Sequence, residues 1–116
     1  MGLTYIEGAA LDYRGLRKNV TFLVDSGAGY SLLPFEIWNE LELKPSREVT
    51  VVLADGTKLS RAVSECRLAI QGVQGTSPVI LGEKGDEPLL GAVTLEILGL
   101  VLDPYKRTLQ PMQLRL

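Results

Sequence analysis

Short apolar runs that recur roughly every ten residues dominate the chain. They are rich in Val, Leu, Ile and Thr, and Gly, Asp, Asn and Pro separate them. Runs of this length and composition are typical of β-strands joined by turns. The sequence therefore predicts an antiparallel barrel or sandwich. The expected strands are residues 3–9, 19–24, 49–53, 58–64, 66–72, 77–81, 100–102 and 108–116.

Turn residues divide these runs at regular places. Residues 13–15 join the first two strands, and residues 103–107 precede the last. Residues 54–57 contain an Asp-Gly pair between two β-branched runs, which is a strong signal for a hairpin. The glycine-rich residues 72–75 join another pair of strands.

Two segments depart from the strand pattern towards helix. In residues 34–41, Pro34 suits the first helical position, and the apolar residues fall on one face. This face consists of Ile37, Trp38 and Leu41. Residues 92–98 form a second short helix that ends at Gly99. No repeat or linker interrupts the chain, so residues 1–116 are expected to form a single domain.

The composition excludes several kinds of chemistry. The chain has 116 residues, no His and one Cys. It therefore has no Ser-His-Asp or Cys-His catalytic group, no intrachain disulfide, and no imidazole or thiolate metal site. The lone Cys66 lies in an apolar strand pattern and is expected to be buried. The remaining chemistry belongs to carboxylates, hydroxyls, amines and the backbone, without a metal.

The charge pattern bears on partners and location. Twelve basic and 14 acidic residues give a net charge of −2, and no basic run exceeds two residues. Nucleic acid is not an expected partner, because phosphate binding needs clustered cations. The apolar runs are too short to span a membrane, and the first residues lack the pattern of a secretion signal. We expect a cytoplasmic protein.

The segment around Asp25 carries the most chemical information. Asp25 follows a wholly apolar run, residues 22–24, and Ser26 and Gly27 come directly after it. Taken alone, these three residues would be an ordinary turn. The apolar residues on both sides instead favour a half-buried site at which backbone N–H groups bind the carboxylate and one oxygen stays free.

This segment resembles the signature of the retropepsin-like aspartic proteases. Residues 24–28, Val-Asp-Ser-Gly-Ala, match the Asp-Ser/Thr-Gly-Ala pattern of that family. Residues 89–91, Leu-Leu-Gly, precede a short helix, as in the family's second element, and the Asp-Gly hairpin lies between the two. The resemblance implies a closed antiparallel β-barrel with one or two short helices. It also implies an aspartic endopeptidase that acts on polypeptides without a cofactor.

The resemblance implies a role for each matching residue. Asp25 would be the catalytic carboxylate, Ser26 would bond across to the partner strand, and Gly27 would donate its N–H to the carboxylate. Ala28 completes the signature. The tip of a flap over bound peptide would consist of Leu53, Ala54, Asp55, Gly56 and Thr57.

The chain also departs from the retroviral pattern. Gly29 and Tyr30 stand where the retroviral enzymes usually carry acidic residues. Both are candidates for a substrate pocket, although Tyr30 could equally pack in the core. Ala92 and Val93 follow Gly91, where a dimer-stabilising Arg is usual.

A single Asp-Ser-Gly segment has a consequence for assembly. The reaction needs two carboxylates, one ionised and one protonated. The other aspartates fit turns or solvated loops, so a symmetric homodimer would supply the second Asp25. Residues 100–102 and 108–116 are expected at its interface. The alternatives are a similar dimer that binds peptide with little or no proteolysis, and a structural β-domain in which Asp25 is a turn residue.

Overall fold

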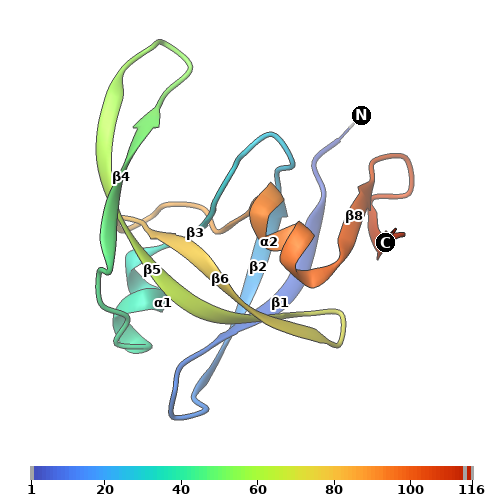
Figure 1. Cartoon of the computed structure of the whole chain (residues 1–116), viewed down its shortest axis with the longest axis horizontal. Helices are drawn as coiled ribbons and strands as arrows, with labels where there is room; N and C mark the ends of the chain where they lie inside the picture. The colour runs from blue at the N-terminus through green and yellow to red at the C-terminus, as the bar shows by residue number, and fades with distance from the viewer. Residues whose placement is uncertain (1, 114, 116) are drawn as a thin grey trace.

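The computed structural model describes residues 2–113 and 115, and Figure 1 shows its course. This part of the chain forms nine strands and two short helices. In chain order they are β1 (Tyr5–Leu11), β2 (Arg17–Val24), β3 (Ser31–Leu33), α1 (Phe35–Glu40), β4 (Arg47–Val52), β5 (Lys58–Ile70), β6 (Val73–Leu81), β7 (Leu89–Leu90), α2 (Ala92–Leu98), β8 (Leu100–Asp103) and β9 (Thr108–Pro111).

Six strands form a closed ring in the order β1-β2-β7-β3-β6-β5, which the pairing of β1 with β5 completes. β4 pairs with the outer part of β5, and together they form a hairpin that projects from the body in Figure 1. The predicted β-rich fold with two short helices is confirmed. The ring is not wholly antiparallel, since β2 runs parallel to β7 and β3 runs parallel to β6. β7 lies between β2 and β3, which run in opposite directions, and can be antiparallel to only one of them.

β5 is a single strand of 13 residues, where the sequence predicted two separate strands. The predicted break fell at Glu65, but this residue continues the alternation as an exposed position between the buried Ser64 and Cys66. β5 therefore pairs with β4 through its first half and with β1 through its second. The turn that follows is also tighter than predicted. Gln71 and Gly72 both have positive φ, 52° and 80°, and β6 begins directly afterwards.

Both helices occupy their predicted segments. Pro34 lies just before α1 and not within it, and Leu41 at its end is almost fully buried. Trp38 packs against the core and donates its indole N–H to the carbonyl of Gly82, at 2.7 Å. α2 has the predicted bounds and ends at Gly99, whose φ of 69° is readily adopted only by glycine.

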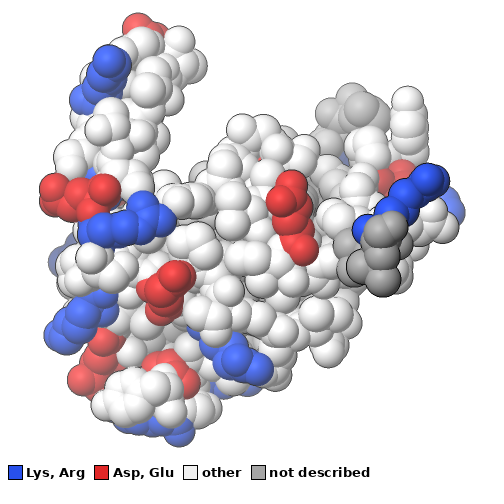
Figure 2. All heavy atoms as spheres, in the orientation of Figure 1, with Lys and Arg blue, Asp and Glu red and all other residues white. Residues whose placement is uncertain are grey.

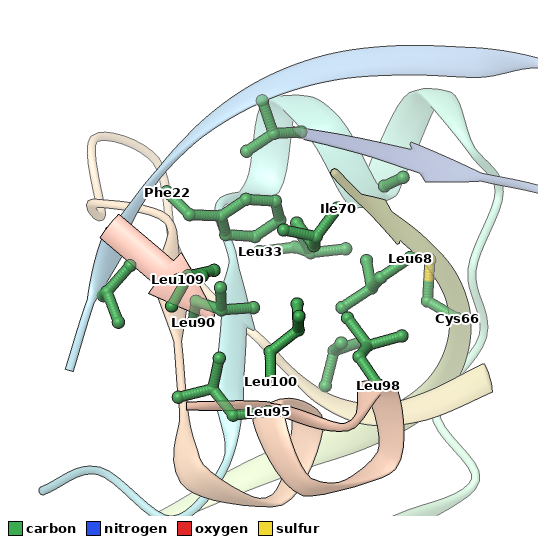
Figure 3. Close-up of a cluster of buried hydrophobic side chains, with 14 of the residues drawn as sticks. Phe22, Leu33, Cys66, Leu68, Ile70, Leu90, Leu95, Leu98, Leu100 and Leu109 are labelled. Carbon is green, nitrogen blue, oxygen red and sulfur yellow. The ribbon is translucent and has the colours of Figure 1, made fainter. Parts of the chain in front are cut away.

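The core fills the ring and extends beneath α2, β8 and β9 (Figure 3). Its labelled side chains are Phe22, Leu33, Cys66, Leu68, Ile70, Leu90, Leu95, Leu98, Leu100 and Leu109. Cys66 is buried, as predicted, and burial raises the pKa of its thiol to about 11. Val24 and Leu90 are also buried, and each immediately precedes a residue of the candidate site. Packing therefore fixes the backbone just before each of these two site residues.

β8 and β9 form a separate two-stranded sheet. The predicted last strand, residues 108–116, is shorter, because β9 ends at Pro111. Residues 114 and 116 of that prediction lie outside the described residues. Neither of the helices described is long and apolar enough to cross a membrane.

Candidate active site

Asp25 begins the loop that leaves the buried end of β2. Its backbone N–H donates to the carbonyl of Leu90 at 3.0 Å, and its own carbonyl accepts the N–H of Ala28 at 3.1 Å. The side-chain oxygen Oδ1 accepts the N–H of Gly27 at 3.0 Å. The predicted half-buried position is wrong for the single chain, because Asp25, Ser26 and Gly27 are all exposed beyond the buried end of β2. The loop thus holds an accessible carboxylate in a fixed orientation, with the Gly27 hydrogen bond that the family resemblance implied.

The loop is also joined by backbone hydrogen bonds to the start of α2, which directly follows the Leu-Leu-Gly segment. Ala92 donates to the carbonyl of Ala28 at 2.8 Å, and Val93 donates to the carbonyl of Gly29 at 3.0 Å. Gly91, the last residue of the Leu-Leu-Gly segment, is buried, and a Cβ there would lie 2.7 Å from the carbonyl carbon and oxygen of Tyr30. Two parts of the chain more than 60 residues apart therefore meet backbone to backbone, at a distance that only glycine permits.

A cleft of about 850 Å³ lies between this loop and the β4–β5 hairpin. Figure 2 shows the surface hollowed between the projecting hairpin and the body. Most of the lining is apolar, and its charged residues are Arg61, Asp86 and Glu87. The lining consists of Gly27, Ala28, Gly29, Tyr30, Leu32, Val49, Thr50, Val51, Val52, Leu53, Leu59, Arg61, Ile80, Asp86, Glu87 and Leu89. Asp25 does not line the cleft. Its carboxylate accepts a hydrogen bond from the N–H of Gly27, and Gly27 is a lining residue.

Tyr30 lines this cleft and is half-buried. Its hydroxyl accepts a hydrogen bond of 2.7 Å from Nη2 of Arg47, whose guanidinium carbon lies 5.5 Å from the ring centroid. Arg47 is the first residue of β4, so this contact ties the base of the hairpin to the candidate loop. The sequence analysis missed Arg47, because nothing in its local sequence indicates this contact.

The predicted flap tip is a tight turn at the end of the hairpin. Leu53 donates its N–H to the carbonyl of Thr57 at 2.8 Å, and Gly56 has a φ of 87°. The side chain and N–H of Thr57 bind the Asp55 carboxyl and hold its pKa below the usual range. Of the five predicted tip residues, only Leu53 lines the cleft. Ala54 and the three residues after it lie beyond it.

Ser26 lies apart from the cleft residues. It lines a second, smaller groove of about 300 Å³ together with residues of α2 and β8. That groove is lined by Ser26, Ala92, Leu95, Glu96, Leu100, Val101, Leu102, Pro104 and Met112. The loop therefore lines the large cleft with residues 27–30 and the smaller groove with Ser26. Within the described residues, no group of three or more Cys, Asp or Glu side chains is placed to hold a metal ion.

Comparisons with known proteins concern the family and the fold of this chain. A comparison with curated proteins found no match. Many solved structures share the fold, and three of them are described below; at their identities of 16% to 18% the likeness concerns the fold alone. The solution structure of simian foamy virus (mac) protease matches with a TM-score of 0.58 and 16% identity, over 79% of this chain and 91% of that one. EIAV protease complexed with the inhibitor HBY-793 matches with a TM-score of 0.61 and 18% identity, over 84% of this chain and 89% of that one.

The third structure is the prototype foamy virus protease-reverse transcriptase, with a TM-score of 0.59 and 18% identity. The match covers 97% of this chain and 12% of that one. A family model described as "gag-polyprotein putative aspartyl protease" matches residues 16–96, which include the Asp25 loop, the hairpin and the Leu-Leu-Gly segment. This match spans well over half of the sequence, and the chain therefore belongs to the gag-polyprotein aspartyl protease family.

Proposed function

We propose that the chain is an aspartic endopeptidase whose catalytic group is Asp25, paired with Asp25 of a second copy in a symmetric homodimer. One observation carries this proposal. The Asp25 carboxylate is exposed, oriented by the Gly27 N–H, and adjacent to an apolar cleft of about 850 Å³. An ordinary surface turn requires neither buried residues directly before it nor a cleft beside it.

The chemistry follows from two carboxylates at close range. They share one proton, since two like charges at such a distance are costly. The ionised carboxylate accepts a proton from water as the water oxygen attacks the carbonyl carbon of the peptide bond. The protonated carboxyl donates to the carbonyl oxygen, which gives a tetrahedral diol. The carboxyl that received the water proton then passes it to the nitrogen as the C–N bond breaks, and a hydroxyl of the diol returns its proton to the other carboxylate, so that the pair again holds one proton. No cofactor takes part.

The surface around Ser26 supports a second copy at this position. β8 presents an exposed apolar side chain there, since Val101 is 48% exposed and lines the smaller groove with Ser26. Most of the other residues that line this groove are also apolar. A two-fold contact through this face would bring each Ser26 towards its partner's loop and would bury apolar surface.

The cleft supports an extended peptide as the substrate. β4 pairs only with β5, and its alternate residues Val49 and Val51 are less exposed than their neighbours. Leu32 and Ile80 line the cleft from the body. Apolar side chains of a substrate would fit between these two walls, while its backbone passes the Asp25 loop.

The test is cleavage of a diverse peptide pool between about pH 3 and 7, a range in which a carboxylate pair changes protonation. We expect the wild-type chain to cleave, Asp25→Asn to lose activity, and Glu65→Gln, which removes an exposed carboxylate of β5, to keep it. Cleavage that survives Asp25→Asn would refute the mechanism. Binding of peptide without cleavage would favour an inactive binding dimer.

A mixing experiment tests the shared site separately. Increasing amounts of the Asp25→Asn chain are added to a fixed amount of wild type. If two copies form one site, mixed dimers lack one carboxyl group and the activity per wild-type chain falls. Glu65→Gln chains should cause no such fall. Unchanged activity per wild-type chain in the Asp25→Asn mixture would mean that one chain holds the complete site.

A further inference from the structure

Three hydroxyl side chains form a buried line beneath the Asp25 loop. Ser31 at the start of β3 lies 2.5 Å from Thr94 of α2, measured between their side-chain oxygens. Thr94 lies 2.7 Å from Ser77 of β6 in the same way. All three residues have 0% exposure. We call Ser31, Thr94 and Ser77 the hydroxyl chain.

The direction of the hydroxyl chain follows from its two ends. Ser77 donates its single proton to the carbonyl of Pro78 at 3.1 Å, because a carbonyl can only accept. Either oxygen can donate in the two contacts of Thr94, and when Ser77 makes this bond, Thr94 donates to Ser77 and Ser31 donates to Thr94. Ser31 in turn accepts the backbone N–H of Gly91 at 2.9 Å. Each hydroxyl thus donates once and accepts once, in one direction.

The hydroxyl chain ends at Gly91, whose two neighbours bond to the Asp25 loop. Gly91 lies between Leu90, whose carbonyl accepts the N–H of Asp25, and Ala92, whose N–H binds Ala28. All three hydroxyls belong to residues with 0% exposure, so a broken link would leave a buried donor or acceptor without its partner. The Gly91 backbone can then shift only together with Ser31, α2 and β6.

We propose that Thr94 is a positioning residue for Asp25, acting through Ser31 and the Gly91 backbone. This inference rests on the proposed function. In a two-fold dimer the distance between the two Asp25 carboxylates depends on the loops of both copies. A shift of the Asp25 loop therefore changes this distance from both sides. Thr94 touches neither the cleft nor the carboxylate, and its effect belongs to the chemical step and not to substrate binding.

The test compares three variants. Thr94→Val keeps the shape of the side chain and removes the hydroxyl, whereas Thr94→Ser keeps the hydroxyl. Ile70→Val shortens a fully buried side chain where β5 pairs with β1, and controls for a general loss of core packing. For Thr94→Val we expect kcat to fall roughly tenfold with KM within about twofold, the pattern of a lost transition-state interaction.

Thr94→Ser should restore kcat to within about threefold, and Ile70→Val should leave it within about twofold. Equal losses in Thr94→Val and Thr94→Ser would overturn the proposal, since they would indicate a packing effect. An equal loss in Ile70→Val would also overturn it. If Thr94→Val does not fold, Ser77→Ala takes its place, because it removes the last hydroxyl and leaves α2 intact.

Amide hydrogen exchange measures the same positioning without any substrate. In Thr94→Val the N–H groups of Gly91 and Asp25 should exchange at least about tenfold faster, while those of β1 and β5 stay unchanged. Unchanged exchange at Gly91 and Asp25 would refute the positioning role. A wild-type protein that cleaves no peptide would refute the proposed function instead, and the exchange experiment would still decide the role of Thr94.

Discussion

Gly91→Ala is expected to weaken the junction between the Asp25 loop and α2. The added Cβ would lie 2.7 Å from the carbonyl carbon and oxygen of Tyr30 and 2.9 Å from the carbonyl oxygen of Gly29. All three are backbone atoms, so no side chain can rotate away. Relief requires the two segments to separate, which would lengthen the hydrogen bonds from Ala92 and Val93.

The size of the effect can be built from these two terms. Overpacking a tight interior contact costs about 2 kcal/mol, and weakening two backbone hydrogen bonds adds about 1 kcal/mol. The total of about 3 kcal/mol is a large part of the roughly 6 to 17 kcal/mol expected for a chain of this length. In thermal unfolding it corresponds to a fall in Tm of about 10 °C.

Gly29→Ala is the matched control, because a Cβ at Gly29 meets nothing within 4 Å. It should change the free energy of unfolding by no more than about 0.5 kcal/mol. Both variants are unfolded in urea at one protein concentration, since a dimer's stability depends on concentration. A Gly91→Ala protein as stable as the wild type, or a Gly29→Ala protein that is destabilised equally, would refute the steric reasoning.

Two further predictions concern groups outside the site. Burial raises the pKa of the Cys66 thiol to about 11, so iodoacetamide at pH 8 should label the unfolded chain and leave the native one unlabelled; rapid native labelling would contradict this. Desolvation raises the pKa of Asp12, but hydrogen bonds from Arg14 and Leu16 outweigh it and lower the pKa. Because the pKa of Asp12 is lower in the folded chain than in the unfolded one, its ionised carboxylate stabilises the fold above about pH 4. This stabilisation is lost as the pH falls through the folded-state pKa. Asp12→Asn should therefore lower the urea midpoint at pH 7 and less so at pH 3, and an equal deficit at both would count against this.

Local sequence signals were sufficient for some parts of the site. Asp25, Ser26 and Gly27 are adjacent in sequence, and the same backbone turn that places them also forms the hydrogen bond from Gly27. The Asp-Gly hairpin and the helix ending at Gly99 are local in the same sense. Their positions depend on neighbours within a few residues, and a sequence pattern records such neighbours directly.

Other parts depend on contacts that a single sequence does not record. Ser31, Thr94 and Ser77 are small polar residues in apolar surroundings, and each alone is compatible with an exposed position. Their burial follows from α2 lying across β3 and β6, which is a long-range arrangement. The parallel pairing of β2 with β7 has the same origin, because a strand of two residues carries too little pattern to identify its partner.

The two walls of the cleft are held in different ways, and this bears on what substitutions in each should do. The body wall is tied through buried backbone bonds at Gly91 and through the hydroxyl chain. The hairpin wall is held by pairing with β5 and by the exposed contact of Arg47 with Tyr30. Changes in the body wall therefore affect stability and the Asp25 loop together. Changes near the hairpin tip, where Val52 is 61% exposed, should alter peptide binding with little loss of stability.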